Sequence, residues 1–523
     1  MLQHTDKPTR HVVVVGGGAA GWLTAAIIAA EHAVPTGNAL TVTLVESPDV
    51  RILGVGEGTW PTMRDTLRKI GISEREFLTS CDASFKQGTC FNQWVTGQPN
   101  DRYYHPFSLP AGYFEADTTA WWLANNTNQP FADVLSTQAA LCEASKAPKQ
   151  WQTPQYAAVA NYGYHLNANK FADLLKRHCT EKLGVQHCVT HVEGVNAAKN
   201  GDVLSLHTRD KGEISGDLFI DCTGFAAHLI GGHCGVPLTS VSAVLKNNTA
   251  LAVQADYALP DADIASATHS SAREAGWIWD IALPTRKGVG YVYSDEHTDE
   301  ARAREVLVDY LNSDSTTAAV DPDAIRKISY QPGYRKTLWQ NNVVAIGTSA
   351  GFLEPLEASA LVMIELSAQM LAKQLPAHRA VMPAVARQFN QVFAGRWQRI
   401  IDFLKLHYVL SQRSDTDYWR VMRSRETCSE QLNDWLTQWQ YRPPHHSDFQ
   451  FSEEIFPTAS YLFVLYGMGY ATQLNTQQFH AQRLAAAEPF IGQNQQLKTK
   501  QLQGLPANRE WLSRLHAQFS KAG

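Results

Sequence analysis

A cluster of glycines close to the N-terminus has the spacing of a phosphate-binding turn. Four valines at positions 12–15 are followed at once by Gly16, Gly18 and Gly21, and then by an apolar run with helical character, 22–30. In a strand, turn and helix of this kind, the first glycine makes the tight turn and the second lets a pyrophosphate approach the backbone. The third lets helix and strand pack closely, and the phosphates face the helix N-terminus. The pattern therefore predicts a bound dinucleotide.

A second apolar run, 40–45, ends in Glu46, where the adenosine ribose of a dinucleotide needs an acceptor. The glycine motif does not distinguish FAD from NAD. Two later apolar runs, 217–225 and 343–348, carry Thr-Gly and Gly-Thr near their ends. Distant strands that return to one cofactor suit a long dinucleotide, so they favour FAD. Since no second glycine motif of this type follows a strand, electrons are expected from outside, with transient docking of NAD(P)H as the alternative.

Four sequence blocks resemble, in family order, the flavin-dependent halogenases, the group that includes the tryptophan halogenases. They are Gly-Val-Gly-Glu-Gly-Thr-Trp-Pro-Thr at 54–62, Ala-Ser-Phe-Lys-Gln-Gly at 83–88, Trp-Ile-Trp-Asp-Ile at 277–281, and Gly-Phe-Leu-Glu-Pro-Leu-Glu-Ala-Ser at 351–359. The first resembles the loop that in this family couples to the flavin ring. Two positions depart from the family pattern: Ala282 replaces a signature proline, and Ala358 replaces the serine that usually follows the glutamate. Neither change removes a group that the family's chemistry requires.

The resemblance implies how the chemical roles are divided. Reduced FAD and oxygen convert a halide, held on the backbone amides of Ser359 and Ala360, into hypohalous acid. Lys86 aligns with the family's essential lysine, which presents electrophilic halogen to one ring carbon of the substrate. Glu357 aligns with the catalytic carboxylate, which stabilises the charged ring and takes its proton. Without the resemblance, Lys86 would be interpreted as a surface lysine and Glu357 as a helix cap.

Aromatic residues indicate the substrate side. Trp277 and Trp279 alternate on an expected strand, so both indoles are expected on one face. In the resembled family this pair separates flavin from substrate, which suppresses hydroxylation. His105 and Phe107 match the residues that hold the indole ring in tryptophan halogenases. The residues that grip the amino-acid half are not recognisable around 441–456.

The motif and the resemblance together imply a set of cofactor-binding residues. These are Gly16, Gly18, Ala19, Ala20, Gly21, Glu46, Val55, Gly56, Val192, Thr348 and Leu361. FAD is expected to arrive reduced from a separate flavin reductase, with chloride or bromide as co-substrate. The chain is compatible with a homodimer.

Composition excludes several other classes of protein. The 523 residues carry 45 Lys+Arg and 50 Asp+Glu, a net charge of −5 without a basic block, which argues against nucleic-acid and anionic-membrane partners. The eight cysteines form no Cys-x-x-Cys pair, and the adjacent His445 and His446 follow two prolines as in a solvated loop, so no metal is expected. Glycines interrupt the apolar run 12–30, which therefore predicts neither a signal peptide nor a membrane helix. A cytoplasmic protein is expected.

The order of elements predicts an α/β fold with α+β elements. We expect a Rossmann-like FAD-binding domain of the flavin monooxygenase type, built discontinuously from residues 1–95 and 160–375. The aromatic-rich insertion 96–159 and the segment 376–523, with apolar residues at helical spacing, are expected to form a helical substrate-binding lobe.

The sequence therefore predicts an FAD-dependent halogenase that acts on a free aromatic substrate: tryptophan, indole or an indole derivative. Three alternatives stay open. One is an aromatic hydroxylase of similar fold, and another is a halogenase whose substrate is bound to a carrier protein. The third is a catalytically idle flavin-binding or electron-transfer protein, against which the presence of Lys86 and Glu357 in matched blocks argues.

Overall fold

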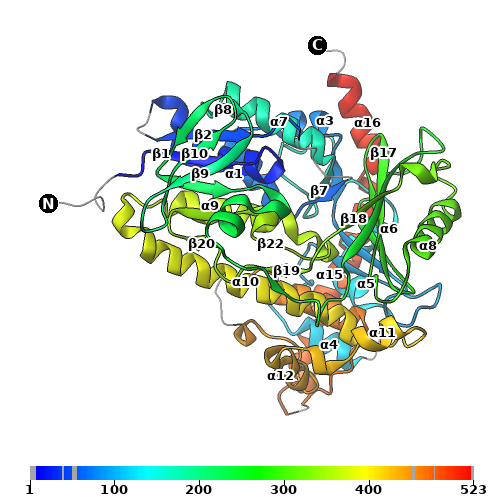
Figure 1. Cartoon of the computed structure of the whole chain (residues 1–523). Helices are drawn as coiled ribbons and strands as arrows, with labels where there is room; N and C mark the ends of the chain where they lie inside the picture. Colours follow the sequence, from blue (N-terminus) through cyan, green and yellow to red (C-terminus); the bar gives the residue numbers. More distant parts are fainter. Residues whose placement is uncertain are drawn as a thin grey trace. The chain divides into compact units, whose positions relative to one another are not determined.

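The computed structural model describes residues 8–37, 40–49, 56–125, 128–449, 454–475 and 477–519. It is a mixed α/β structure, as the sequence predicts (Figure 1). The contacts divide the chain into two compact units, each made of three separate segments. The first unit comprises residues 1–82, 166–241 and 331–397, and the second comprises residues 83–165, 242–330 and 398–523.

The first unit is centred on a sheet with the strand order β20-β21-β12-β1-β2-β8. The strands are β20 (Trp339–Gln340), β21 (Val343–Ala345), β12 (Leu218–Asp221), β1 (His11–Val15), β2 (Thr41–Glu46) and β8 (Gln186–Val189). All neighbours are parallel except β20 and β21. Val12, Val13 and Val14 are completely buried, as expected for a parallel sheet covered on both faces.

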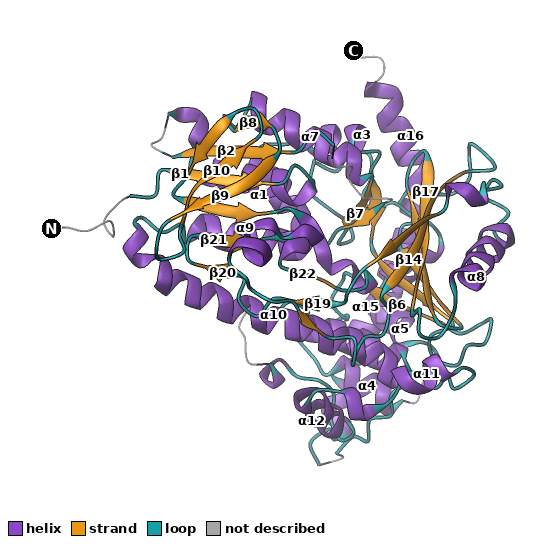
Figure 2. Cartoon of the chain, viewed as in Figure 1, coloured by secondary structure: helices purple, strands orange, loops and turns teal. Residues whose placement is uncertain are grey.

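Several helices of this unit lie beside this sheet (Figure 2). They are α1 (Ala19–Glu31), α2 (Thr62–Ile70), α3 (Glu74–Ser80), α7 (Ala168–Glu181) and α9 (Ser359–Lys373). Helix α1 packs against α2, α7 and α9, and α2 also contacts α9. The remaining strands of this unit are short: β3 (Glu57–Gly58), β9 (Val192–Ala197), β10 (Val203–Thr208), β11 (Gly212–Ser215), β13 (Thr239–Ser240), β19 (Gly333–Tyr334) and β22 (Gly351–Phe352).

The second unit contains a sheet with the order β18-β14-β17-β16-β15-β5-β6. Its strands are β18 (Arg326–Ser329), β14 (Thr249–Asp256), β17 (Arg286–Tyr293), β16 (Gly276–Ala282), β15 (Thr268–Arg273), β5 (Gly88–Asn92) and β6 (Arg102–Pro106). The pairs are antiparallel apart from β15 and β5. Helix α8 (Glu300–Ser313) packs on β14 and β17 over an apolar core that includes Leu251, Tyr291 and Leu307. A separate strand, β4 (Ser84–Lys86), pairs with β7 (Gly163–Leu166).

The rest of the second unit is mainly helical. Its helices are α4 (Thr118–Ala124), α5 (Phe131–Leu135), α6 (Gln138–Glu143), α11 (Asp417–Met422), α12 (Glu430–Trp439), α13 (Thr458–Gly467), α14 (Ala481–Ala485), α15 (Glu488–Gly504) and α16 (Asn508–Phe519). Helix α10 (Met382–Leu410) is shared between the units. The apolar positions predicted at helical spacing, from Phe389 to Tyr408, lie in α10 and are buried, which confirms that helix.

The observed units do not coincide with the expected domains. Residues 83–95, 160–165 and 242–330, which the sequence groups with the FAD-binding domain, lie in the second unit, and residues 376–397, which it groups with the substrate-binding lobe, lie in the first. For residues 242–330 the cause is strand pairing. Because β15 pairs in parallel with β5, the strands between residues 249 and 329 share a sheet with strands from residues 88–106. Within the described ranges, no helix combines the length and hydropathy that crossing a bilayer requires.

Candidate active site

The glycine-rich turn has the geometry expected of a phosphate cradle. Gly16 has φ of +117°, and a Cβ there would lie 2.2 Å from the carbonyl oxygen of Cys222. A Cβ at Gly21 would lie 1.8 Å from the carbonyl oxygen of Gly16, so these two positions need glycine for packing. A Cβ at Gly18 would meet no atom within 4 Å. The turn is therefore closed by its first and third glycines and open at its second, at the N-terminus of α1.

Glu46 is the last residue of β2, where the sequence predicts a ribose acceptor. Its Oε1 lies 2.5 Å from the ammonium of Lys176 and 2.8 Å from Nε2 of His187. Its Oε2 is directed at Gly17, because a Cβ on that glycine would come within 1.8 Å of it. The carboxylate is thus held beside the glycine-rich turn by two side chains that the sequence did not point to.

The other expected cofactor residues lie on several elements of the first unit. Ala19 and Ala20 begin α1, Gly56 precedes β3, Val192 begins β9, Thr348 lies in the short helix η6 (Gly347–Ser349), and Leu361 lies in α9. Val55 lies outside the described residues. Their contacts with FAD stay a prediction.

The turn that carries Glu357 has an unusual backbone. Glu357 has φ of 65° and Ala358 has φ of 54°, two consecutive left-handed residues that are not glycine. Each such residue costs about 1–3 kcal/mol and persists only where its surroundings hold it in place. The indole nitrogen of Trp60 donates a hydrogen bond of 2.8 Å to the carbonyl oxygen of Glu357. The side chain of Glu357 is only 6% exposed.

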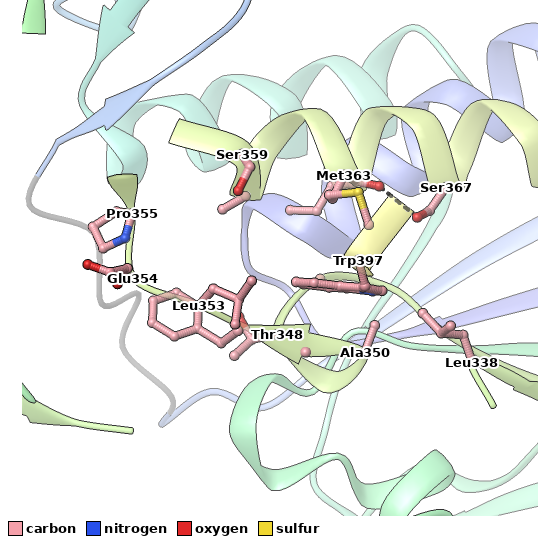
Figure 3. A pocket seen from close by; sticks show the side chains of 15 residues that line it. Leu338, Thr348, Ala350, Leu353, Glu354, Pro355, Ser359, Met363, Ser367 and Trp397 are labelled. Carbon is pink, nitrogen blue, oxygen red and sulfur yellow. Dashed lines mark hydrogen bonds between the residues drawn. The ribbon is translucent and has the colours of Figure 1, made fainter. Parts of the chain in front are cut away.

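Helix α9 begins directly after this turn, at Ser359, so its first amide N–H groups have no acceptor within the helix. Ser359, Ala360 and Thr348 line a cavity of about 50 Å³. Figure 3 shows Ser359 and Met363 on α9 at one side of this cavity, with Thr348 and the Trp397 indole also at its wall. About 10–15 Å³ suffices for one water, so the cavity has room for a small anion next to a helix N-terminus.

In the second unit, Lys86 ends strand β4, opposite Gly163. It is 1% exposed, so it is not a surface lysine. Its ammonium nitrogen lies 5.5 Å from the centre of the Phe107 ring. The structure thus brings together two residues that the sequence assigns to catalysis and to substrate binding.

The two residues after Lys86 explain the rest of its sequence block. The backbone carbonyl of Gln87 accepts a hydrogen bond of 3.0 Å from the amide of Phe107. A Cβ at Gly88 would lie 2.4 Å from the carbonyl oxygen of His105, because β5 and β6 approach closely there. This packing fixes Phe107 next to Lys86.

His165 is a buried neighbour of Lys86 that the sequence did not single out. It lies opposite Ser84 on the paired strands β4 and β7, diagonal to Lys86. Its Nε2 is 2.8 Å from the hydroxyl of Thr268. Burial, and next the charge of Lys86, hold the pKa of His165 well below its usual range, so the ring is neutral at physiological pH.

The predicted tryptophan pair lies on strand β16, as expected. The ring centres of Trp277 and Trp279 are 6.5 Å apart, which agrees with two indoles on one face. A Cβ on Gly290, opposite Trp279 in the sheet, would lie 2.2 Å from that indole. Trp279 therefore packs over a position that only glycine can occupy.

His105 is buried among aromatic side chains, with ring centres 5.9 Å from Phe403 and 6.4 Å from Phe463. Elsewhere, His445 accepts a hydrogen bond from the Ser447 amide in a capping box with Asp448. No group of three or more potential metal ligands occurs in the part of the chain that the structure describes.

Comparison with known proteins adds a decisive observation. The protein family described as tryptophan halogenase matches residues 11–483 of this chain. The chain belongs to the tryptophan halogenase family. Members of this family are flavin-dependent halogenases.

The tryptophan halogenase relationship extends over nearly the whole chain. A solved structure of a tryptophan halogenase from Shewanella frigidimarina is 47% identical, with a TM-score of 0.94, and the match covers 98% of this chain and 99% of that one. Tryptophan 6-halogenase SttH from Streptomyces toxytricini is 31% identical, over 89% of this chain and 90% of its own length. Tryptophan 7-halogenase RebH from Lentzea aerocolonigenes is 28% identical, over 97% and 98%.

Sequence reasoning missed the side chains that support the predicted site residues. These include Trp60 beside Glu357, Glu365 on α9, His165 beside Lys86 and Gly290 under Trp279. Trp60 falls in the matched loop 54–62, and this was the one sequence feature that could have pointed to a supporting residue. The other three lie outside the matched blocks, and Glu365 and His165 bond to residues 103–303 positions away in the chain.

Proposed function

We propose that this chain is an FAD-dependent halogenase that uses reduced FAD, oxygen and chloride or bromide to halogenate a free aromatic substrate: tryptophan, indole or an indole derivative. One observation carries the proposal. In a chain of the tryptophan halogenase family, the lysine of the Phe-Lys-Gln-Gly block is buried and lies 5.5 Å from the ring of Phe107, the predicted substrate residue.

The residues of the first unit fit FAD. The open position at Gly18, beside the α1 N-terminus, leaves space for a pyrophosphate, and Glu46 is directed toward the turn. Gly16, Gly21, Ala19, Ala20, Gly56, Val192, Thr348 and Leu361 complete the proposed binding set. When bound in reduced form, FAD supplies with oxygen the oxidising power that turns halide into hypohalous acid.

Halide binding is assigned to the backbone amides of Ser359 and Ala360. These amides start α9, where the helix dipole favours an anion, and both residues line the small cavity. Stripping a halide of water in such a cavity makes it more reactive toward an oxidant.

Lys86 is assigned the transfer of halogen. In its neutral form, the Lys86 amine can hydrogen-bond hypohalous acid or form a chloramine and so present halogen to one ring carbon. Neutral His165 places no positive charge beside Lys86. Glu357 then stabilises the positive charge on the substrate ring and accepts the proton that leaves.

The substrate pocket is assigned to His105, Phe107, Trp277 and Trp279. Phe107 and His105 hold a flat ring near Lys86, and the two indoles exclude the substrate from the flavin, which favours halogenation over hydroxylation. The tryptophan 6- and 7-halogenases among the relatives act on tryptophan. The amino-acid grip is not recognisable in this sequence, so indole itself is an equal candidate.

We further assign FAD binding to residues 1–95 and 160–375 and substrate binding to 96–159 and 376–523. The electrons come from a separate flavin reductase, the protein is cytoplasmic, and a homodimer is compatible with this function.

Mass spectrometry tests the proposal. Purified protein is incubated with FAD, a flavin reductase, NADH and oxygen, with tryptophan or indole, in chloride and then in bromide. A product with the halogen isotope pattern is expected. A product heavier by one oxygen would instead identify a hydroxylase, and conversion only of a carrier-bound substrate would identify a halogenase that acts on carrier-bound substrates.

A further inference from the structure

The buried carboxyl group of Glu365 joins α2 and α9, two helices whose relative position matters for the proposed chemistry. We propose that Glu365 is a positioning residue that fastens α2 to α9 and thereby holds the Glu357 turn in its left-handed conformation. This inference rests on the proposed function only for its catalytic consequence. The structural part stands on contacts within the first unit.

Glu365 lies in the middle of α9 and is completely buried. The hydroxyl of Thr66 donates a hydrogen bond of 2.5 Å to its Oε1, and the hydroxyl of Thr62 lies 3.3 Å from its Oε2. Gln369, one turn further along α9, donates a hydrogen bond of 3.0 Å to the hydroxyl of Thr66. Both threonines belong to α2, so the carboxyl group ties the first turns of α2 to α9.

A second contact joins the same two segments. Trp60 lies two residues before α2 and donates its indole N–H to the carbonyl of Glu357, two residues before α9. The two contacts therefore join the same segments at two points, one in the turn before α9 and one at Glu365, about two helical turns into α9. If α2 moved away from α9, the Trp60 hydrogen bond would lengthen with it.

The backbone of the turn explains why such a fastening is needed. Two consecutive left-handed residues, Glu357 and Ala358, relax to ordinary conformations unless their surroundings prevent it. That relaxation would redirect the Glu357 carboxylate and the first amides of α9, which are the proposed proton acceptor and halide site. A loose turn should therefore bind halide weakly.

Glu365 serves this role as a neutral acid. Burial, together with the nearby Asp65, raises its pKa to about 8, and the described contacts of its carboxyl group are hydroxyl groups rather than cations. The hydroxyl groups of Thr66 and Thr62 both donate to the carboxyl oxygens, and a hydroxyl group can also accept a hydrogen bond. Glutamine can therefore keep both contacts, whereas leucine preserves only the volume.

Hydrogen exchange of the full-length protein tests the structural part without any activity. Amides in residues 354–361 are followed by mass spectrometry in wild type, Glu365→Gln, Glu365→Leu and the control Cys179→Ala. The control removes a buried side chain of α7 whose thiol donates to the carbonyl of Trp22 on α1 rather than to a residue of α2 or α9. Glu365→Leu should speed exchange in this segment by about tenfold, whereas Glu365→Gln and the control should stay within about twofold.

If Glu365→Leu does not fold, Thr66→Val removes the same hydrogen bond with little change in volume and should speed exchange in the same segment. Unchanged protection of residues 354–361 in the leucine or valine variant would overturn the proposal.

Steady-state assays test the catalytic part. Glu365→Leu should raise the apparent KM for halide by about tenfold and raise the ratio of peroxide to halogenated product, with the KM for indole unchanged. Glu365→Gln should restore wild-type values. Equal halide KM values for leucine and wild type would refute the catalytic part. Failure of wild type to halogenate any substrate would refute the proposed function and leave the exchange result intact.

Discussion

The pH dependence of stability provides a quantitative test of the neutral carboxyl group at position 365. Its pKa is raised from the ordinary value of 4.5 to about 8 by burial. The folded chain keeps a proton that the unfolded chain loses between these two pH values. The stability that Glu365 contributes is therefore complete below pH 4.5 and is lost as the pH rises through 8.

The magnitude follows from this difference. At pH 7 the solution pH is about 2.5 units above the pKa of this carboxyl group in the unfolded chain, and each unit is worth about 1.4 kcal/mol. The free energy of unfolding of wild type is therefore about 3 kcal/mol lower than that of a variant whose residue 365 does not titrate. Glutamine keeps the hydrogen bonds to Thr66 and Thr62 and carries no proton to lose. Glu365→Gln should therefore match wild type near pH 4.5 and exceed its stability by about 3 kcal/mol at pH 7.

Urea unfolding at pH 5, 6, 7 and 8 measures this difference, with the midpoint and slope of each transition compared between the two proteins. Ser367→Ala is the control. It removes a buried hydroxyl from α9 without changing any titrating group, so its offset from wild type should be the same at every pH. Parallel pH profiles for Glu365→Gln and wild type would show that the carboxyl group is ionised in the folded chain.

Four substitutions probe the site more directly. Glu357→Gln should lower kcat for halogenation by about 100-fold with the fold intact, and an unchanged rate would reduce Glu357 to a structural role. Gly290→Ala should displace the Trp279 indole, since the new Cβ would lie 2.2 Å from it, and cost about 1–3 kcal/mol of stability with more hydroxylated product or released peroxide. Unaltered stability would mean that the indole moves freely. Gly18→Ala should fold, because the new Cβ meets no protein atom, but it should bind FAD at least about tenfold more weakly, as measured by flavin fluorescence. Gly21→Ala should fail to fold, because its Cβ would collide with the backbone of Gly16 even when no FAD is bound. Equal FAD affinity for Gly18→Ala and wild type would contradict the proposal that the pyrophosphate binds beside Gly18.

The parts of the fold that could be predicted are those that depend on residues close together in the sequence. The glycine-rich turn, its flanking strand and helix, and the alternating tryptophans on β16 each depend on residues a few positions apart. Helix α10 was predictable because its apolar residues recur at helical spacing.

Long-range pairing was not predictable from spacing. Strands β15 and β5 pair although Thr268 and Thr89 are far apart in the sequence, and this pairing moves residues 242–330 to the second unit. The apolar pattern of a strand indicates that it pairs with another strand, but it does not identify that strand.

The candidate site divides in the same way. Lys86 and Glu357 were found through family blocks, and no local pattern distinguishes them from other lysines and glutamates. Glu365 has the sequence context of an ordinary helical position, and its threonine partners lie about 300 residues earlier in the chain. Its role depends on burial, which a single sequence does not display.

The most direct test of the central claim compares wild type with Lys86→Ala and Lys86→Met in the indole and bromide reaction, following brominated product and peroxide together. Wild type should brominate indole, while both variants should still bind FAD and release peroxide but form no brominated product. Bromination at the wild-type rate in either variant would contradict the assignment of halogen transfer to Lys86.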